Sequence, residues 1–255
     1  MKTTVTKKLA ISLLMLVLPV LVLANEGVEL EHIKADASNK ESLQNGAKMY
    51  VNYCMGCHSL KYMRFERMAD DLGIPHELVQ EHLNPAGKSV AGYDAKKIGE
   101  LMTIAASEKT QKRWFGAPPP DLSLEARLHG GPDWVYTYLM SFYQDDSRPY
   151  GVNNKVFKDV GMPHVLADLQ GTQACEVHVD EHHSKHVGEC KITKAGTMTK
   201  KEYEVAVYDL VNFLDYAAEP AKAKRVGMGL WVLFYVLIFI FVAVLLNNEY
   251  WKDVH

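Results

Sequence analysis

The sequence predicts a mainly α-helical exported domain that is held to a membrane by one C-terminal transmembrane helix. Three observations support this prediction. A short apolar segment follows lysines at the amino terminus, two internal stretches show helical spacing of apolar residues, and a long uncharged run lies near the carboxyl terminus. The chain between these ends shows no internal repeat and no low-complexity linker. Residues 25–221 are therefore expected to form one domain.

The amino terminus has the layout of a secretory signal peptide. Three lysines precede an apolar run over residues 9–23, and the small residue Ala24 follows it. This order of basic, apolar and small-residue regions is typical of a cleaved export signal. A first membrane span is the alternative, but the run is short and contains Pro19. We predict a signal peptide over residues 1–24, which leaves an exported domain of residues 25–221.

The carboxyl-terminal run, GMGLWVLFYVLIFIFVAVLL, covers residues 227–246 and contains no charged residue. An α-helix needs about 20 residues to cross the hydrocarbon core of a bilayer. A buried core helix is disfavoured, because a soluble protein rarely buries a helix that is apolar on every face. Trp231, Tyr250 and Trp251 suit the two membrane interfaces. We predict a membrane anchor over residues 222–255 with its span at 227–246.

The charges around this span conflict with the signal peptide. Lys222, Lys224 and Arg225 precede the span and only Lys252 follows it, which favours a cytoplasmic amino-terminal flank. The export signal places that flank outside instead. We give the signal precedence, because large domains cross membranes largely regardless of their charge. The basic cluster is then expected to meet anionic lipid headgroups on the outer side, and the tail to be cytoplasmic.

The net charge of the chain is −3, and removing a signal segment with three lysines and no acidic residue makes it −6. A mildly acidic domain gives no support to nucleic-acid binding.

The stretch VNYCMGCHSL, residues 51–60, contains the strongest chemical pattern. Cys54 and Cys57 lie three apart, and His58 follows directly. A structural zinc site usually needs a second pair of ligands, whereas Cys175 and Cys190 are fifteen apart. A thioredoxin-like dithiol is expected within a βαβ pattern, which the sequence does not show.

The pattern CxxCH is instead the attachment signature of c-type haem. Two thiols add to the two vinyl groups, and the adjacent imidazole is then held under the iron. We predict one covalently bound haem c, tethered by Cys54 and Cys57, with His58 as the proximal iron ligand.

Two helices are predicted to hold this motif. The residues SNKE at 38–41 form a capping-box pattern, and apolar residues continue at helical spacing from Leu43 to Cys54. TKKE at 199–202 is a second capping box. An apolar stripe follows it, made of Tyr203, Val207, Leu210, Val211 and Leu214. Small haem c domains pack a C-terminal helix across the CxxCH helix, so we expect these two helices to pack together.

The second axial ligand decides what such a haem does. An open position favours ligand binding or peroxide chemistry, whereas Met with His favours electron transfer at raised potential. After methionines in the signal, the span, the CxxCH region and the helical runs are set aside, Met162 and Met198 remain. Met198 precedes a helix N-cap and is expected to pack in the core. Met162 lies between Gly161 and Pro163, which favour an irregular loop, and loops commonly present ligands. We predict Met162.

The second pair of cysteines encloses CEVHVDEHHSKHVGEC, residues 175–190, which contains four histidines. Metal binding is one interpretation of His178, His182, His183 and His186. The other is a disulfide that closes a hydrated loop, as expected outside the cytoplasm. Irregular histidine spacing and many charged residues favour the disulfide between Cys175 and Cys190, which would contribute about 3 kcal/mol in the chain-entropy model.

Longer segments resemble the cytochrome c1 family. They are CMGCHSLKYMRFERMADDLGI, WFGAPPPDLSLEARLHGGPDWVYTYLMSFY, VFKDVGMPHVL and FLDYAAEPAKAKRVGMG, and the resemblance covers most of residues 45–250. It implies a class I cytochrome c-like haem domain with insertions. It places the domain in the periplasm, on a single-pass anchor in a bacterial inner membrane. The implied function is to relay single electrons from the Rieske iron–sulfur protein to a periplasmic cytochrome c. This occurs within the cytochrome bc1 complex, which also contains cytochrome b, and without substrate chemistry in the chain itself.

The resemblance also assigns residues. It agrees with thioether bonds at Cys54 and Cys57 and with axial ligation by His58 and Met162. The haem pocket that it adds consists of Pro119, Pro120, Arg127 and Trp134. The two prolines match residues that wall the haem, and Trp134 matches an aromatic residue near it. Arg127 fits one family arginine as a propionate ligand. The other family position holds His129 here, so either side chain is a candidate for that contact.

Three alternatives stay open at this point. An electron-transfer haem subunit of another periplasmic dehydrogenase would share the CxxCH motif and the anchor, but not GAPPPDLS and GMPHV. A haem enzyme or gas sensor would have an open sixth position. A metal-storing or scaffold protein would use the histidines between Cys175 and Cys190.

Overall fold

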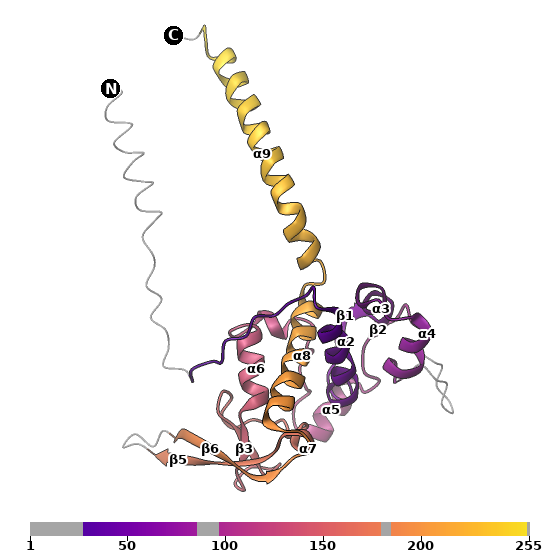
Figure 1. Ribbon diagram of the computed structural model, residues 1–255, viewed down its shortest axis with the longest axis vertical. Helices are drawn as coiled ribbons and strands as arrows, with labels where there is room; N and C mark the ends of the chain where they lie inside the picture. Colours follow the sequence, from indigo (N-terminus) through magenta and orange to yellow (C-terminus); the bar gives the residue numbers. More distant parts are fainter. Residues whose placement is uncertain (1–27, 86–96, 180–184, 254–255) are drawn as a thin grey trace.

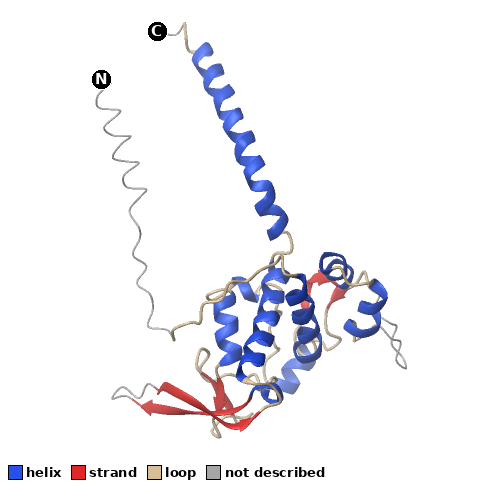
Figure 2. Ribbon diagram, in the orientation of Figure 1, coloured by secondary structure: helices blue, strands red, loops and turns tan. Residues whose placement is uncertain are grey.

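The computed structural model describes residues 28–85, 97–179 and 185–253. The predicted signal peptide, residues 1–24, lies outside this part of the chain. Helices dominate the described residues, which confirms the mainly α-helical class, and three two-stranded antiparallel sheets accompany them (Figure 2).

The helices are α2 (Lys40–Met49), α3 (Phe65–Leu72), α4 (His76–Leu78), α5 (Glu108–Phe115), α6 (Pro132–Met140), α7 (Ala167–Gln170), α8 (Lys200–Ala218) and α9 (Lys222–Tyr250). Shorter helical turns are η1 (Tyr50–Cys54), η2 (Val79–Leu83) and η3 (Glu125–Arg127). The strands pair as β1 (Leu60–Arg64) with β2 (Leu101–Met102), β3 (Phe142–Gln144) with β4 (Val152–Asn154), and β5 (Gly171–Val179) with β6 (Lys185–Ala195).

The centre of the core is the contact between α2 and α8, with α6 on α8 beside it (Figure 1). All five residues of the predicted α8 stripe are buried, which confirms that the two predicted helices pack together. The approach is close at Gly46 of α2. A Cβ there would collide with the backbone carbonyl of Asp209 and lie 2.6 Å from Cβ of Phe213. Glycine at this position therefore lets the two backbones meet.

Of the two predicted capping boxes, the one at α8 is confirmed and the one at α2 is not. The capping box of α8 is present, since Thr199 Oγ1 accepts from the amide of Glu202 and the Glu202 carboxylate accepts from the amide of Thr199. The capping box predicted from Ser38 is wrong. The cap of α2 is Asn39, whose side chain accepts from the amide of Ser42 at 3.1 Å. Because the helix begins one residue later than predicted, the Ser38 hydroxyl does not cap it and donates to Asp36 instead.

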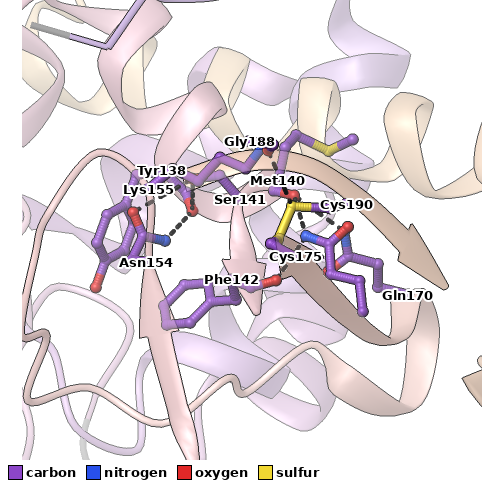
Figure 3. The surroundings of a disulfide bond; sticks show 11 residues. Tyr138, Met140, Ser141, Phe142, Asn154, Lys155, Gln170, Cys175, Gly188 and Cys190 are labelled. Carbon is purple, nitrogen blue, oxygen red and sulfur yellow. Dashed lines mark hydrogen bonds between the residues drawn. A yellow bond between two sulfur atoms is a disulfide. The ribbon is translucent and has the colours of Figure 1, made fainter. Parts of the chain in front are cut away.

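The described residues around Cys175 and Cys190 form strands and not the loop that the sequence predicted, although most of them are exposed to solvent as expected. This segment lies in the long β5–β6 hairpin, where the two cysteines are cross-strand partners joined by a disulfide (Figure 3). The strands are rich in polar and charged residues, so no apolar alternation revealed them in the sequence. His182 and His183 lie outside the described residues. Among the residues that are described, no group of three or more His, Cys, Asp or Glu side chains could hold a metal ion.

Helix α9 leaves the domain at the end opposite the β5–β6 hairpin (Figure 1). It is the single helix in the described part of the chain that is long and apolar enough to cross a membrane, over Lys224–Tyr250, and its most apolar 18 residues have a mean hydropathy of 2.9. Its apolar window is not covered by the rest of the molecule. Near its start, Lys222 Nζ lies 2.9 Å from an Asp215 oxygen and Arg225 binds Glu219. Two of the three cations predicted to meet lipid headgroups thus have acidic partners within the protein.

Candidate haem-binding site

The CxxCH motif follows α2 without a break. Helix α2 widens into the π-helical turn η1, which ends at Cys54. The carbonyl oxygen of Cys54 accepts hydrogen bonds from the amides of Cys57 at 3.0 Å and His58 at 2.9 Å. Buried Tyr50 donates its hydroxyl to the carbonyl of His58 at 2.7 Å. π-Helical turns are rare overall but common at functional sites. Here η1 ends at Cys54, and the hydrogen bonds to the Cys54 carbonyl bring Cys57 and His58 into one tight turn with it.

His58 is prepared to act as a neutral nitrogen ligand. Its side chain is buried, with 9% of the residue exposed, and Nδ1 lies 2.7 Å from the carbonyl oxygen of Pro120. A carbonyl can only accept, so Nδ1 carries the proton and Nε2 keeps its lone pair. Burial lowers the pKa of His58, against the opposing effects of the Pro120 carbonyl, Glu125 and Asp121. A lowered pKa favours the neutral imidazole, which is the form that could bind iron.

The two thiols of the motif are free, with Cys54 buried and Cys57 partly buried. Burial, followed by the nearby Cys57, raises the pKa of the Cys54 thiol to about 12, so it is protonated at neutral pH. Leu124 and Leu128 flank η3 close to Pro120 in the chain and are 45% and 51% exposed. These residues fit haem c, because two unpaired thiols, a neutral imidazole and an uncovered apolar surface are what a covalently bound porphyrin requires.

Pro119 and Pro120 belong to a segment that runs along β1. The amide of Leu122 donates to the Ser59 carbonyl at 2.9 Å, and the amide of Lys61 donates to Asp121 Oδ2 at 3.0 Å. These contacts place the Pro120 carbonyl against His58. The walling of the haem by Pro119 and Pro120 stays a prediction.

Met162 lies in the loop between β4 and α7, and its sulfur accepts a hydrogen bond of 3.3 Å from the hydroxyl of Tyr138 on α6. Trp134 stacks on Tyr138 with ring centroids 5.1 Å apart and on His129 at 4.7 Å. The Glu125 carboxylate is near enough to raise the pKa of Tyr138, after burial as the main cause, and also to influence His58. The charge of Glu125 therefore acts on groups of both sides of the site.

The two candidates for a propionate contact have different surroundings. Arg127 pairs with Glu219 at the end of α8, and Glu219 also binds Arg225 of α9 at 2.6 Å. His129 Nε2 lies 3.8 Å from Glu125 Oε1 and its ring stacks on Trp134. Arg127 thus has a protein partner that joins η3 to the base of the membrane helix. Its role toward a propionate stays a prediction, as does that of His129.

Sequence reasoning missed Tyr138, Glu125 and the Pro120 carbonyl as parts of this site. Tyr138 follows Trp134 by one helical turn, and this spacing was the one available signal that both rings lie on the same face of α6. The Pro120 carbonyl is a backbone group, for which the sequence offers no signal.

A domain that is built around this site and carries α9 as its anchor is a membrane-anchored cytochrome of the c type. The family model described as the Cytochrome C1 family matches residues 32–254. The chain belongs to the cytochrome c1 family.

Three relatives show the range of similarity. Cytochrome c1 of Allochromatium vinosum is 44% identical over 98% of this chain and 100% of its own length. The ammonia monooxygenase gamma subunit of Nitrosomonas europaea is 42% identical over 91% of this chain and 92% of its own length. Cytochrome c1 of Rhodobacter capsulatus is 24% identical over 84% of this chain and 83% of its own length.

Membership of this family makes the chain an electron-transport protein with one covalently bound haem c. It is the haem c subunit of a cytochrome bc1 complex, which also contains cytochrome b and a Rieske iron–sulfur protein, and α9 fits its membrane anchoring.

Proposed function

We propose that this chain relays single electrons from the Rieske protein to a cytochrome c in the periplasm, through an iron held by His58 and Met162. When bound, haem c supplies a reversible one-electron couple. Cys54 and Cys57 would tether the group, the Pro120 carbonyl orients the His58 ring, and the Met162 thioether would be the second iron ligand. A Met and His pair raises the potential and leaves no position for a substrate. The chain therefore performs no substrate chemistry of its own.

One observation supports this proposal above the others. Both candidate ligand side chains are held by hydrogen bonds, Met162 by the Tyr138 hydroxyl and His58 by the Pro120 carbonyl. Met198, the other candidate, instead packs partly buried against the core, and its amide donates to the Leu169 carbonyl at 3.1 Å. A haem enzyme or sensor would need the sixth position to be open.

The test is the variant Met162→Leu in the full-length protein, with Met198→Leu as the matched control. Leucine has a similar size, so packing losses should stay under about 1.5 kcal/mol. We expect covalent haem to be retained, the potential to fall sharply and carbon monoxide to bind the reduced protein. Met198→Leu should leave the potential nearly unchanged. A wild-type potential with continued exclusion of carbon monoxide in Met162→Leu would contradict the ligand assignment.

The proposed sidedness rests on the predicted signal over residues 1–24 and on α9 as a single pass. Protease added to spheroplasts should digest the haem domain, whereas inside-out vesicles should protect it. The mature amino terminus should be Asn25, as measured by mass spectrometry. Digestion in the inside-out vesicles alone would reverse the proposed orientation.

The partners are tested by purification from membranes through a tag on this chain. Cytochrome b and a Rieske protein should co-purify in equal amounts. The name of the Nitrosomonas europaea relative favours a second candidate, an electron-transfer subunit attached to an oxygenase. Co-purification of oxygenase subunits without cytochrome b would select that candidate.

A further inference from the structure

The Met162 loop is attached to α6 through two different atoms of Tyr138. The phenol hydroxyl donates to the Met162 sulfur at 3.3 Å. The backbone carbonyl of the same residue accepts from Asn154 Nδ2 at 2.7 Å (Figure 3). Asn154 is 2% exposed, and its Oδ1 accepts from the amides of Val156 at 2.9 Å and Phe157 at 3.1 Å. Asn154 therefore fixes the start of the segment that leads to Met162 relative to Tyr138.

The ring of Tyr138 cannot easily turn away from this loop. Trp134 stacks on it with an interplanar angle of 11°, and Phe142 meets it edge-on with centroids 5.1 Å apart. Phe142 in turn stacks on His164, two residues beyond Met162, with centroids 4.9 Å apart. Trp134 and Phe142, which both contact the Tyr138 ring, thus hold the phenol as a fixed donor toward the sulfur.

We propose that Tyr138 is a positioning residue for the distal thioether, and that its hydrogen bond to Met162 raises the reduction potential. This inference rests on the proposed role of Met162 as an iron ligand. A thioether sulfur has two lone pairs, so it can accept a weak hydrogen bond while the other pair is used for the metal. The bond withdraws electron density from sulfur and weakens its donation to the oxidised iron. The reduced state is then relatively stabilised, as for other hydrogen bonds to metal ligands.

The test is Tyr138→Phe in the full-length protein, because this change keeps the stacked ring and removes only the hydroxyl. We expect unchanged covalent haem, continued exclusion of carbon monoxide and a lower potential. The shift should not exceed a tenfold change in the electron-exchange equilibrium, which is about 59 mV for one electron. The matched control is Tyr136→Phe, a buried tyrosine on the same helix, which should leave the potential unchanged.

A double-mutant cycle shows whether the hydroxyl acts through the sulfur. In the Met162→Leu background, Tyr138→Phe should produce no further shift, because the acceptor is gone. A shift that persists there, or an unshifted potential in the single variant, would overturn the role of Tyr138. That outcome leaves the proposed function intact as long as Met162→Leu itself lowers the potential. If Met162→Leu keeps the wild-type potential, the proposed function and this inference both fail.

Discussion

The two sides of the haem site are built in different ways. On the histidine side, the ligand and both thiols lie within residues 54–58, and two amide hydrogen bonds to Cys54 close the turn. On the methionine side, Met162 depends on Tyr138 and Asn154, which come from α6 and β4. The difference separates two tasks. Under the proposed site assignment, a local, covalent attachment would secure the cofactor, whereas a non-local, non-covalent contact would adjust the potential.

The methionine side also has an outer support. Gln173 of β5 donates to the Phe142 carbonyl at 2.6 Å, and Lys155 donates to the Gly188 carbonyl of β6 at 2.7 Å (Figure 3). These bonds attach the disulfide-linked hairpin to β3 and to the segment that follows β4 and leads to Met162. On the histidine side, the corresponding support comes from the Pro120 segment bonded along β1 and from the packing of α2 against α8.

The largest expected effect is on the histidine side. Cys54→Ser or Cys57→Ser should prevent normal haem attachment, because each thioether bond needs its own thiol. Haem-stained gels of the exported protein measure this directly. Cys175→Ser is a suitable control, since it should leave haem staining in place. Undiminished covalent haem in both Cys54→Ser and Cys57→Ser would show that the motif serves another purpose.

An intermediate effect is expected on the methionine side. Replacing Cys175 and Cys190 together by Ala removes a cross-link that closes fifteen residues and should lower the free energy of unfolding by about 3 kcal/mol. Guanidinium titration of the purified protein in detergent, followed by the haem absorption, measures the loss. Covalent haem should be retained. A loss well below 1 kcal/mol would mean that the hairpin contributes little to the stability of this side.

The smallest effect is expected at the start of α8, the helix that packs against α2 and so supports the histidine side. Thr199→Ala removes the hydroxyl of the capping box and should cost about 1 kcal/mol of unfolding free energy. The same titration measures it, and Thr199→Ser, which keeps the hydroxyl, should restore most of the loss. Equal losses in the Ala and Ser variants would show that the methyl group, rather than the cap, is responsible.

The sequence by itself determined the parts of this protein whose signals are local. The CxxCH motif, the α8 capping box with its apolar stripe and the uncharged span each depend on residues that lie close together in the chain. Periodicity, capping and hydropathy report such short-range preferences, because each element must match its own residues to water, core or lipid. Met162 was also selected from its Gly and Pro neighbours, although its ligand role stays a proposal.

Only the tertiary structure decided which distant groups meet these elements. The Pro120 carbonyl reaches His58 across 62 residues, and the Tyr138 hydroxyl reaches Met162 across 24. Arg127 meets Glu219, and polar strands pair where a loop was expected. A backbone carbonyl, a phenol or a polar strand has many possible partners of similar energy. Which partner it finds depends on how the helices pack, and that packing is a property of the whole chain.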